Sequence, residues 1–229
     1  MLKTVKEKSL KGLPFFCSFS GGKDSCLALY RAIKEGAIPK FLLTMCVEDG
    51  QKTRSHAIPI EVIRAQAESM GISLIIRNTS WDDYEKSFIT AIGDFKAEGI
   101  NTGIFGDIDL EPHRKWEEKV CKAVNIKPIL PLWKQGRKEL LLEVLSLNFK
   151  ATIIAVKEEK IDKHFLGRIL DHKIIAEFEA LGIDACGEEG EYHTVVTDGP
   201  LFSKPLKIKK EGISQGPAGY CFLEYKLKK

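Results

Sequence analysis

Ser20-Gly21-Gly22-Lys23-Asp24-Ser25 is the stretch that decides the fold, because it follows an apolar run and opens a segment with helical apolar periodicity. Two glycines let the backbone turn tightly with positive φ and bring its N–H groups close to an anion. The start of the helix adds unpaired N–H donors and the positive end of the helix dipole. The two serines and the lysine add hydroxyl and ammonium donors. The stretch therefore predicts a polyphosphate site between a strand and a helix.

The same six residues do not form a Walker A loop, since G-x-x-x-x-G-K-[ST] is absent and the lysine directly follows a glycine pair. The pattern S-G-G-K-D-S resembles the signature of the PP-loop ATP pyrophosphatases. That resemblance implies that the loop, with Lys23, binds the β- and γ-phosphates of ATP as the leaving group. A substrate oxygen then attacks the α-phosphate. For Asp24, capping of the helix start stands beside a part in a magnesium–phosphate site.

Short apolar runs alternate with longer amphipathic stretches through the first half of the chain. Such an alternation needs right-handed crossovers and builds a parallel sheet that is covered on both faces. We therefore predict a doubly wound α/β domain, which the resemblance identifies as adenine nucleotide α-hydrolase-like (HUP, PP-loop). The predicted strands are Pro14–Phe19, Lys40–Val47, Ser73–Arg77, Gly103–Asp107 and Lys127–Leu130.

The rhythm changes after Pro131-Leu132-Trp133, where strand-like runs follow one another with fewer helices between them. Adjacent strands favour a mixed or antiparallel sheet. We place a domain boundary near Trp133, with residues 1–133 as the ATP-binding domain and residues 134–229 as a smaller α+β substrate domain. A cleft is expected between the two. The later predicted strands are Ala151–Val156, Glu191–Thr197, Leu206–Lys209 and Gly219–Leu227.

Charge and composition narrow the classes of partner. The formal charge is +3 from 35 basic and 32 acidic residues, so nucleic acid is not an expected partner unless a local patch exists. No apolar run approaches the roughly 20 residues that span a bilayer, and Met1 to Gly12 lacks the apolar segment of a signal peptide. We expect a cytoplasmic protein without membrane contact. The six cysteines are scattered and show no zinc or redox motif.

Three further stretches narrow the resemblance. They are Gly106-Asp107-Ile108-Asp109, Phe165-Leu166-Gly167-Arg168-Ile169-Leu170-Asp171 and Cys186-Gly187-Glu188-Glu189-Gly190-Glu191-Tyr192-His193-Thr194. With the phosphate loop, they resemble the ATP-binding family that contains diphthine–ammonia ligase. The resemblance implies an AMP-forming ligase that uses ATP, Mg²⁺ and ammonia, with elongation factor 2 carrying diphthine as a candidate partner. It places the carboxylate substrate near residues 188–194.

Two residues depart from the pattern of that family, which reads G-E-G-G-E-[F/Y]-E-T in the last stretch. This chain has Glu189 in place of a glycine and His193 in place of the second-to-last glutamate. The departures resemble a prokaryotic side branch whose acceptor need not be diphthine.

Asp107 is predicted at the carboxyl end of a parallel strand, where open α/β sheets bind ligands. A carboxylate there can help to hold Mg²⁺ between ATP oxygens, so Asp107 joins Asp24 as a candidate metal ligand and is predicted to bind the nucleotide. We predict Asp107 and Lys23 as catalytic residues. Asp109 and Glu111 precede Pro112 and a helix, so capping and dipole compensation are the favoured explanation for them, and Asp107 alone is predicted at the site.

Strand alternation puts Glu191 and His193 on one face, with Tyr192 and Thr194 on the other. An acid beside an imidazole at a cleft can bind an amine, orient ammonia or remove its proton. We predict Glu191 and His193 as catalytic and substrate-binding residues, and Glu188 and Thr194 as substrate-binding residues. A solvated polar face is the alternative.

Two further side chains complete the predicted site. His56 lies just before the second helix and is predicted to face the nucleotide, with a surface or capping role as the alternative. Arg168 can reach a phosphate or carboxylate with its bidentate fork, or can form an interdomain ion pair.

Three functions remain open from the sequence. The first is the AMP-forming ligase that amidates a carboxylate. Position 2 is Leu2 and not the cysteine of a processed amidotransferase, and the chain has no room for a glutaminase domain. We therefore expect free ammonia, or ammonia from a partner, as its nitrogen source. The second is a tRNA-modifying PP-loop enzyme, and the third is an ATP or AMP sensor without turnover. A homo-oligomer is compatible with each.

Overall fold

The computed structural model describes residues 10–228, so Leu2 and most of the predicted polar start lie outside the described part. Its strands are β1 (Pro14–Ser18), β2 (Ile38–Cys46), β3 (Ser73–Asn78), β4 (Thr102–Ile104), β5 (Lys127–Ile129), β6 (Ala151–Lys157), β7 (Tyr192–Val196), β8 (Ile208–Gln215) and β9 (Tyr220–Leu227). Its α-helices are α1 (Lys23–Lys34), α2 (Ile60–Met70), α3 (Tyr84–Ala97), α4 (Glu111–Ala123), α5 (Arg137–Ser146) and α6 (His172–Ala180). Two short 3₁₀ turns cover Lys163–Phe165 and Pro217–Gly219.

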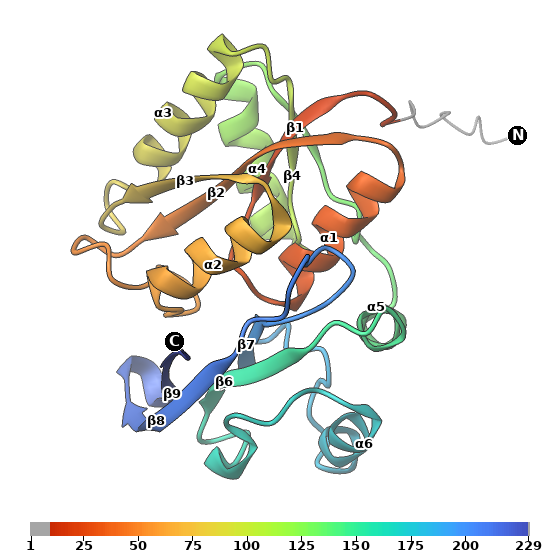
Figure 1. Ribbon diagram of the computed structural model, residues 1–229, viewed down its shortest axis with the longest axis vertical. Coiled ribbons are helices and arrows are strands. Elements are labelled where there is room, and N and C mark those ends of the chain that lie inside the picture. The colour runs from red at the N-terminus through yellow and green to blue at the C-terminus, as the bar shows by residue number, and fades with distance from the viewer. Residues whose placement is uncertain (1–9, 229) are drawn as a thin grey trace, which may run out of the picture.

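The first five strands form one parallel sheet in the order β3-β2-β1-β4-β5 (Figure 1). Successive side chains of β1 point to opposite faces of the sheet, and helices cover both faces. Phe15 and Cys17 pack with α1 and α2, whereas Phe16 packs with α3 and α4. The predicted doubly wound α/β fold is confirmed.

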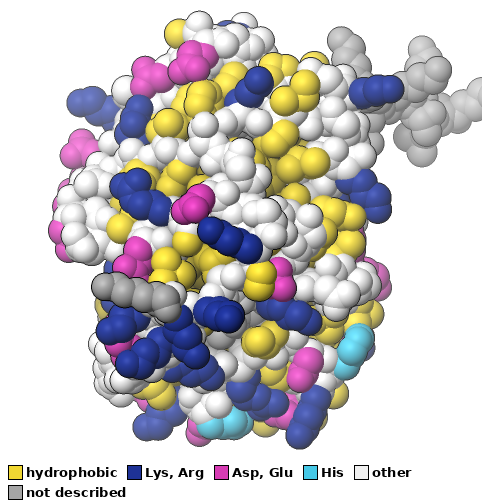
Figure 2. Space-filling view, in the orientation of Figure 1, with side chains coloured by type: hydrophobic (Ala, Val, Ile, Leu, Met, Phe, Trp, Pro, Cys, Tyr) yellow, Lys and Arg dark blue, Asp and Glu magenta, His cyan; other side chains and the backbone are white. Residues whose placement is uncertain are grey.

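The last four strands form a smaller antiparallel sheet in the order β7-β6-β9-β8, below the first sheet in Figure 1. The predicted strand Leu206–Lys209 was too short, because β8 continues through polar residues to Gln215. β8 is an edge strand, and most of its side chains are exposed. Figure 2 shows basic side chains gathered over this region, where charge discourages pairing with another chain.

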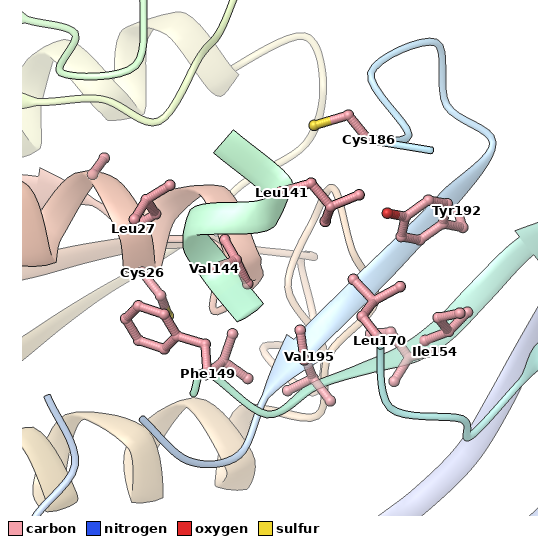
Figure 3. Close-up of a cluster of buried hydrophobic side chains, with 14 of the residues drawn as sticks. Cys26, Leu27, Leu141, Val144, Phe149, Ile154, Leu170, Cys186, Tyr192 and Val195 are labelled. Carbon is pink, nitrogen blue, oxygen red and sulfur yellow. The ribbon is translucent and has the colours of Figure 1, made fainter. Parts of the chain in front are cut away.

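One hydrophobic cluster joins the two sheets. Cys26 and Leu27 of α1 lie opposite Val144 of α5, and Val195 of β7 lies next to them (Figure 3). The core therefore continues past Trp133, and a division of the chain at that residue remains our proposal. Among residues 10–228, no helix is long and apolar enough to cross a membrane.

The fourth strand is shorter than predicted, and this changes the place of Asp107. β4 ends at Ile104, although the N–H of Phe105 still donates to the carbonyl of Ile129 at 3.0 Å. Gly106 then carries the chain across the first turn of α1: a Cβ on Gly106 would lie 3.0 Å from the backbone nitrogen of Ser25. Asp107 consequently lies in the loop after the strand.

Candidate nucleotide-binding site

A pocket of about 880 Å³ opens at the carboxyl ends of β1, β2 and β4 and is closed from the other half of the chain by the segment leading into β7. Most of the predicted side chains line it. They are Ser20, Lys23, Asp24, Ser25, His56, Asp107, Glu188, His193 and Thr194. The size suits a drug-sized or nucleotide-sized ligand.

The phosphate loop has the backbone geometry that its glycines require. Gly21 has a φ of +81°, and a Cβ there would lie 2.6 Å from the side chains of Gln66 and Ile63. The Ser20 hydroxyl accepts from the N–H of Gly22 at 3.3 Å and donates to the Ser25 hydroxyl at 3.1 Å. The loop is thus closed internally before any anion binds.

The loop is also fastened to β7, from the far half of the chain. The side-chain amide of Gln66 donates to the carbonyls of Gly21 at 3.0 Å and Val196 at 2.6 Å, and the N–H of Val196 donates to the carbonyl of Gly21 at 3.0 Å. The hydroxyl of Thr194 accepts from the N–H of Lys23 at 3.1 Å. The hydroxyl of Thr194 thus fixes the start of α1, and its predicted role in substrate binding stays a prediction.

Lys23 carries a buried positive charge at the head of α1. Its side-chain nitrogen lies 2.8 Å from a carboxylate oxygen of Asp24 and 5.6 Å from the centre of the Tyr192 ring. Burial alone would lower the pKa of Lys23, but the Asp24 carboxylate and its neighbours raise it well above the ordinary value. Lys23 is therefore cationic and faces the space where a phosphate chain would lie.

Asp24, Cys186 and Glu188 bring one ligand atom each to within 4.8 Å of one another. Burial and the Asp24 charge raise the pKa of Glu188 to about 7, and burial raises the pKa of Cys186 to about 12. Two carboxylates fit Mg²⁺, which prefers oxygen ligands, whereas a protonated thiol does not. The structure groups Asp24 with Glu188, and the predicted role of Asp107 as a metal ligand stays a prediction.

Asp107 is engaged elsewhere on the pocket wall. One of its oxygens lies 2.7 Å from Nδ1 of His113, and its carboxylate hydrogen-bonds with Glu117. Burial and the bond to Asp107 raise the pKa of Glu117 to about 11, and the bond to Asp107 also raises the pKa of His113. Although burial opposes it, the bonds from His113 and Glu117 lower the pKa of Asp107. This side of the pocket holds Asp107, whose pKa is lowered, between His113, whose pKa is raised, and a neutral Glu117.

His56 and His193 lie in contact at the other end of the pocket, with their ring centres 4.5 Å apart. Burial lowers the pKa of His193 to about 4 and that of His56 well below its ordinary value, and the Lys23 charge adds to both shifts. Both rings are therefore neutral at neutral pH. A Cβ on Gly22 would lie 3.3 Å from Nε2 of His56, so His56 reaches the phosphate loop.

Comparison with known proteins matches both halves of the chain to one family. Residues 16–128 match the diphthamide synthase N-terminal domain, and residues 137–228 match the diphthamide synthase C-terminal domain. The chain belongs to the diphthamide synthase family. The chain is similar to diphthine–ammonia ligase from Homo sapiens, with 31% identity over 82% of this chain and 80% of the relative. The enzyme from Rattus norvegicus is 28% identical over the same shares.

Among solved structures, the U34-tRNA thiolase NcsA from Methanococcus maripaludis, with its [4Fe-4S] cluster, gives a TM-score of 0.41 at 19% identity. The likeness covers 64% of this chain and 61% of that chain. This structural similarity is too low to support a conclusion about the fold or the function of the chain.

In this diphthamide synthase family member, four predicted residues do not line the nucleotide pocket: the loop glycines Gly21 and Gly22, and also Glu191 and Arg168. The carboxylate of Glu191 accepts from the side chain of Lys160 at 3.0 Å and from the N–H of Glu189 at 3.0 Å. The prediction that Glu191 and His193 share one face assumed that both residues lie in a strand. β7 begins only at Tyr192, so strand alternation does not set the side-chain direction of Glu191. Glu191 therefore organises the segment before β7.

Arg168 also lies outside the pocket lining. It pairs with Glu177 through two bonds of 3.0 and 3.2 Å and lies over the Phe165 ring, so it forms an ion pair within the second half. Asp109, for which capping was considered, pairs with Arg137, which also reaches Asp184. Arg137 thus makes one of the ion pairs between the halves, together with Arg31–Glu143, Lys52–Glu224 and Lys204–Glu68.

Sequence reasoning missed Gln66, Glu117 and Tyr220. The sequence does contain a pattern that points to Glu117, because Glu117 lies at helical spacing from Val120 and Cys121 on the buried face of α4. An acid on a buried stripe marks a paired or protonated carboxyl. Gln66 is likewise a polar residue on the buried face of α2.

Proposed function

We propose that this protein is an ATP-dependent ligase that adenylates a carboxylate, releases pyrophosphate and transfers the acyl group to ammonia with release of AMP. The observation that carries the proposal is the closure of the phosphate loop by β7, which brings Lys23 beside Glu188 and His193. The family match and the diphthine–ammonia ligases among its relatives support the reaction class.

The residues of the pocket suit the two chemical steps. In the first step a carboxylate oxygen bonds to the α-phosphorus of ATP while the bond to the β-phosphate oxygen breaks. The N–H groups of the loop and the Lys23 ammonium favour the pyrophosphate that leaves, because they are fixed donors aimed at growing negative charge. Asp24 and Glu188 would hold Mg²⁺, which screens charge on the phosphate oxygens.

In the second step ammonia bonds to the acyl carbon, AMP leaves, and one ammonia proton must be taken up. Neutral His193 offers a free imidazole nitrogen for that proton, since its lowered pKa keeps it unprotonated before attack. Free ammonia, rather than ammonium, is the nucleophile. The acceptor that the names of the relatives suggest is diphthine, and elongation factor 2 is the expected protein that carries it.

Product analysis of radiolabelled ATP with Mg²⁺ and ammonium tests the proposal, with and without elongation factor 2 carrying diphthine. We expect AMP and pyrophosphate in equal amounts, and an amide on the acceptor. Lys23→Ala should lower the rate about 100- to 1000-fold, the usual cost of a fixed donor to a charged leaving group. Lys34→Ala, at the other end of α1, is the matched control and should leave the rate unchanged.

ADP as the product, or a rate that does not depend on Lys23, would refute the proposal. If AMP and pyrophosphate form at the same rate with and without elongation factor 2, the adenylation step stands and the acceptor is another carboxylate.

A further inference from the structure

Arg137, at the start of α5, connects a loop of the first half with the segment that leads into β7. Its Nε and one terminal nitrogen donate to the two carboxylate oxygens of Asp109 at 2.7 and 2.9 Å. Its other terminal nitrogen donates to Asp184 at 2.8 Å. The planar fork of an arginine suits such paired bonds, which a lysine cannot reproduce. The resulting Asp109–Arg137–Asp184 bridge joins the two halves of the chain.

Asp184 in turn fixes the backbone of the Glu188 segment, which comprises residues 184–190. One of its oxygens accepts from the N–H of Cys186 at 3.0 Å, and the other accepts from the N–H of Glu188 at 3.1 Å. The oxygen that accepts from Glu188 also accepts from Arg137. One carboxylate thus lies between the guanidinium group and the backbone of the candidate magnesium ligand.

The two ends of the Glu188 segment are held by different partners. At the later end, the carbonyl of Gly190 accepts from the hydroxyl of Tyr220 at 2.5 Å. At the earlier end, the carbonyl of Ala185 accepts from the hydroxyl of Tyr192 at 2.7 Å. These four residues all belong to the second half. The bridge through Arg137 adds a connection from the earlier end to the first half.

The closed position of the segment is opposed by charge, because its acid meets another acid in the pocket. Ligand oxygens of Asp24 and Glu188 lie within 4.8 Å of each other, and two charged carboxylates at that distance repel. The side chains of Arg137, Asp109 and Asp184 are only 28, 30 and 18% exposed. Ion pairs shielded in this way are stronger than pairs on an open surface. The bridge therefore opposes the repulsion that would move the segment outward.

We propose that Arg137 is a positioning residue that holds the Glu188 segment closed beside the phosphate loop, so that Glu188 stands ready to bind Mg²⁺ with Asp24. This inference rests on the proposed function for the part that concerns Mg²⁺, but not for the closure itself. Loss of the bridge should open the segment locally and leave both sheets intact.

Alkylation of the full chain by N-ethylmaleimide, followed by peptide mass spectrometry, tests the closure without turnover. Cys186 lies in the segment and is 2% exposed, whereas Cys121 is fully buried on α4 of the first half. Opening of the segment exposes Cys186 alone, but unfolding of the chain exposes both thiols. We expect Arg137→Gln to accelerate the alkylation of Cys186 about tenfold or more and to leave that of Cys121 unchanged.

Two further variants separate the bridge from general effects of charge. Lys138→Gln is the matched control, because Lys138 pairs with Glu179 on an exposed surface within the second half, and it should leave Cys186 protected. Arg137→Lys keeps the charge but not the fork, so it should restore much of the protection and accelerate alkylation only about threefold. If Arg137→Gln does not fold, Arg137→Lys is compared with Lys138→Gln.

The affinity for Mg²⁺ is the second readout, measured by calorimetric titration of the chain saturated with α,β-methylene-ATP. Arg137→Gln should weaken Mg²⁺ binding about fivefold or more, because Glu188 is then displaced from Asp24. The affinity for the nucleotide analogue without Mg²⁺ should change less than about twofold, since the bonds of the phosphate loop remain.

Equal alkylation of Cys186 in the wild type and in Arg137→Gln would overturn the inference, and so would equal acceleration at Cys121 or in Lys138→Gln. An unchanged affinity for Mg²⁺ would also overturn it. If Arg137→Gln opens the segment and weakens Mg²⁺ binding, but the wild type forms no AMP in any assay, the proposed function is wrong and the role of Arg137 stands.

Discussion

The two sides of the nucleotide pocket are assembled over different distances along the chain. On the phosphate-loop side, Lys23 bonds to Thr194, 171 residues away, and Gln66 joins Gly21 to Val196. On the Asp107 side, the partners of the aspartate are His113 and Glu117, both within the next helix. The anion-binding side therefore depends on both sheets, and the carboxylate side depends on one loop and one helix.

The difference separates two kinds of variant. Changes on the loop side should affect the stability of the whole chain and nucleotide binding together, because the same bonds carry both. Changes on the Asp107 side should alter local protonation with little effect on the junction of the sheets.

Gln66→Leu should have the largest effect, because it removes two buried donors that connect the loop with β7. We expect a loss of about 2 to 4 kcal/mol in the free energy of unfolding, since the carbonyls of Val196 and Gly21 both lose a buried donor, although that of Gly21 keeps the N–H of Val196. Urea denaturation measures the loss, and ATP affinity should fall with it. Arg64→Leu, on the exposed face of α2, is the control. A loss no larger than that of the control would remove the distinction between the two sides.

Gly106→Ala should have a smaller effect on stability. Gly106 lies where the loop that leads to Asp107 packs against the first turn of α1. The new Cβ would meet backbone atoms of Asp24 and Ser25 at 3.0 to 3.1 Å, and backbone gives way less readily than a side chain. We expect about 1 to 3 kcal/mol of destabilisation and weaker ATP binding. Gly212→Ala meets no atom within 4 Å and should be nearly neutral. Thermal unfolding with and without ATP compares the pair, and equal behaviour would argue against tight packing at Gly106.

Glu117→Gln should have the smallest effect and one that depends on pH. The pKa of Glu117 rises from 4.5 to about 11 on folding, so its stabilising contribution is complete below pH 4.5 and falls as the pH rises toward 11. Glutamine keeps a donor for Asp107 but does not titrate. The stability of Glu117→Gln relative to wild type should therefore rise with pH, by on the order of 1 kcal/mol per pH unit between about pH 6 and pH 8. Thermal melts across that range measure it; Glu118→Gln, on the exposed side of α4, should show no such trend.

The fold followed from the sequence because its signals are local. The periodicity of apolar residues and the loop at Ser20 to Ser25 depend on neighbours in the chain, and the parallel sheet with covering helices is confirmed. β8 was underestimated because its residues are mostly polar and exposed, and an edge strand buries too little to leave an apolar pattern.

The site was only partly predictable, for the same reason. Lys23, Asp24 and His193 line the pocket. The catalytic roles predicted for Lys23 and His193 and the metal-ligand role predicted for Asp24 remain predictions. Glu191 and Arg168 bind partners within the second half, which no spacing could reveal. The role of Thr194 depends on its bond to Lys23, across 171 residues of chain.

The fastening of the loop to β7 also bears on biosynthesis. A ribosome that adds about 5 to 20 residues per second makes Lys23 roughly 9 to 34 s before Thr194. Throughout that interval the nascent loop lacks the strand that holds it in shape. The growing chain should therefore acquire its nucleotide site late and abruptly, when β7 leaves the ribosome, so that truncated products do not sequester ATP.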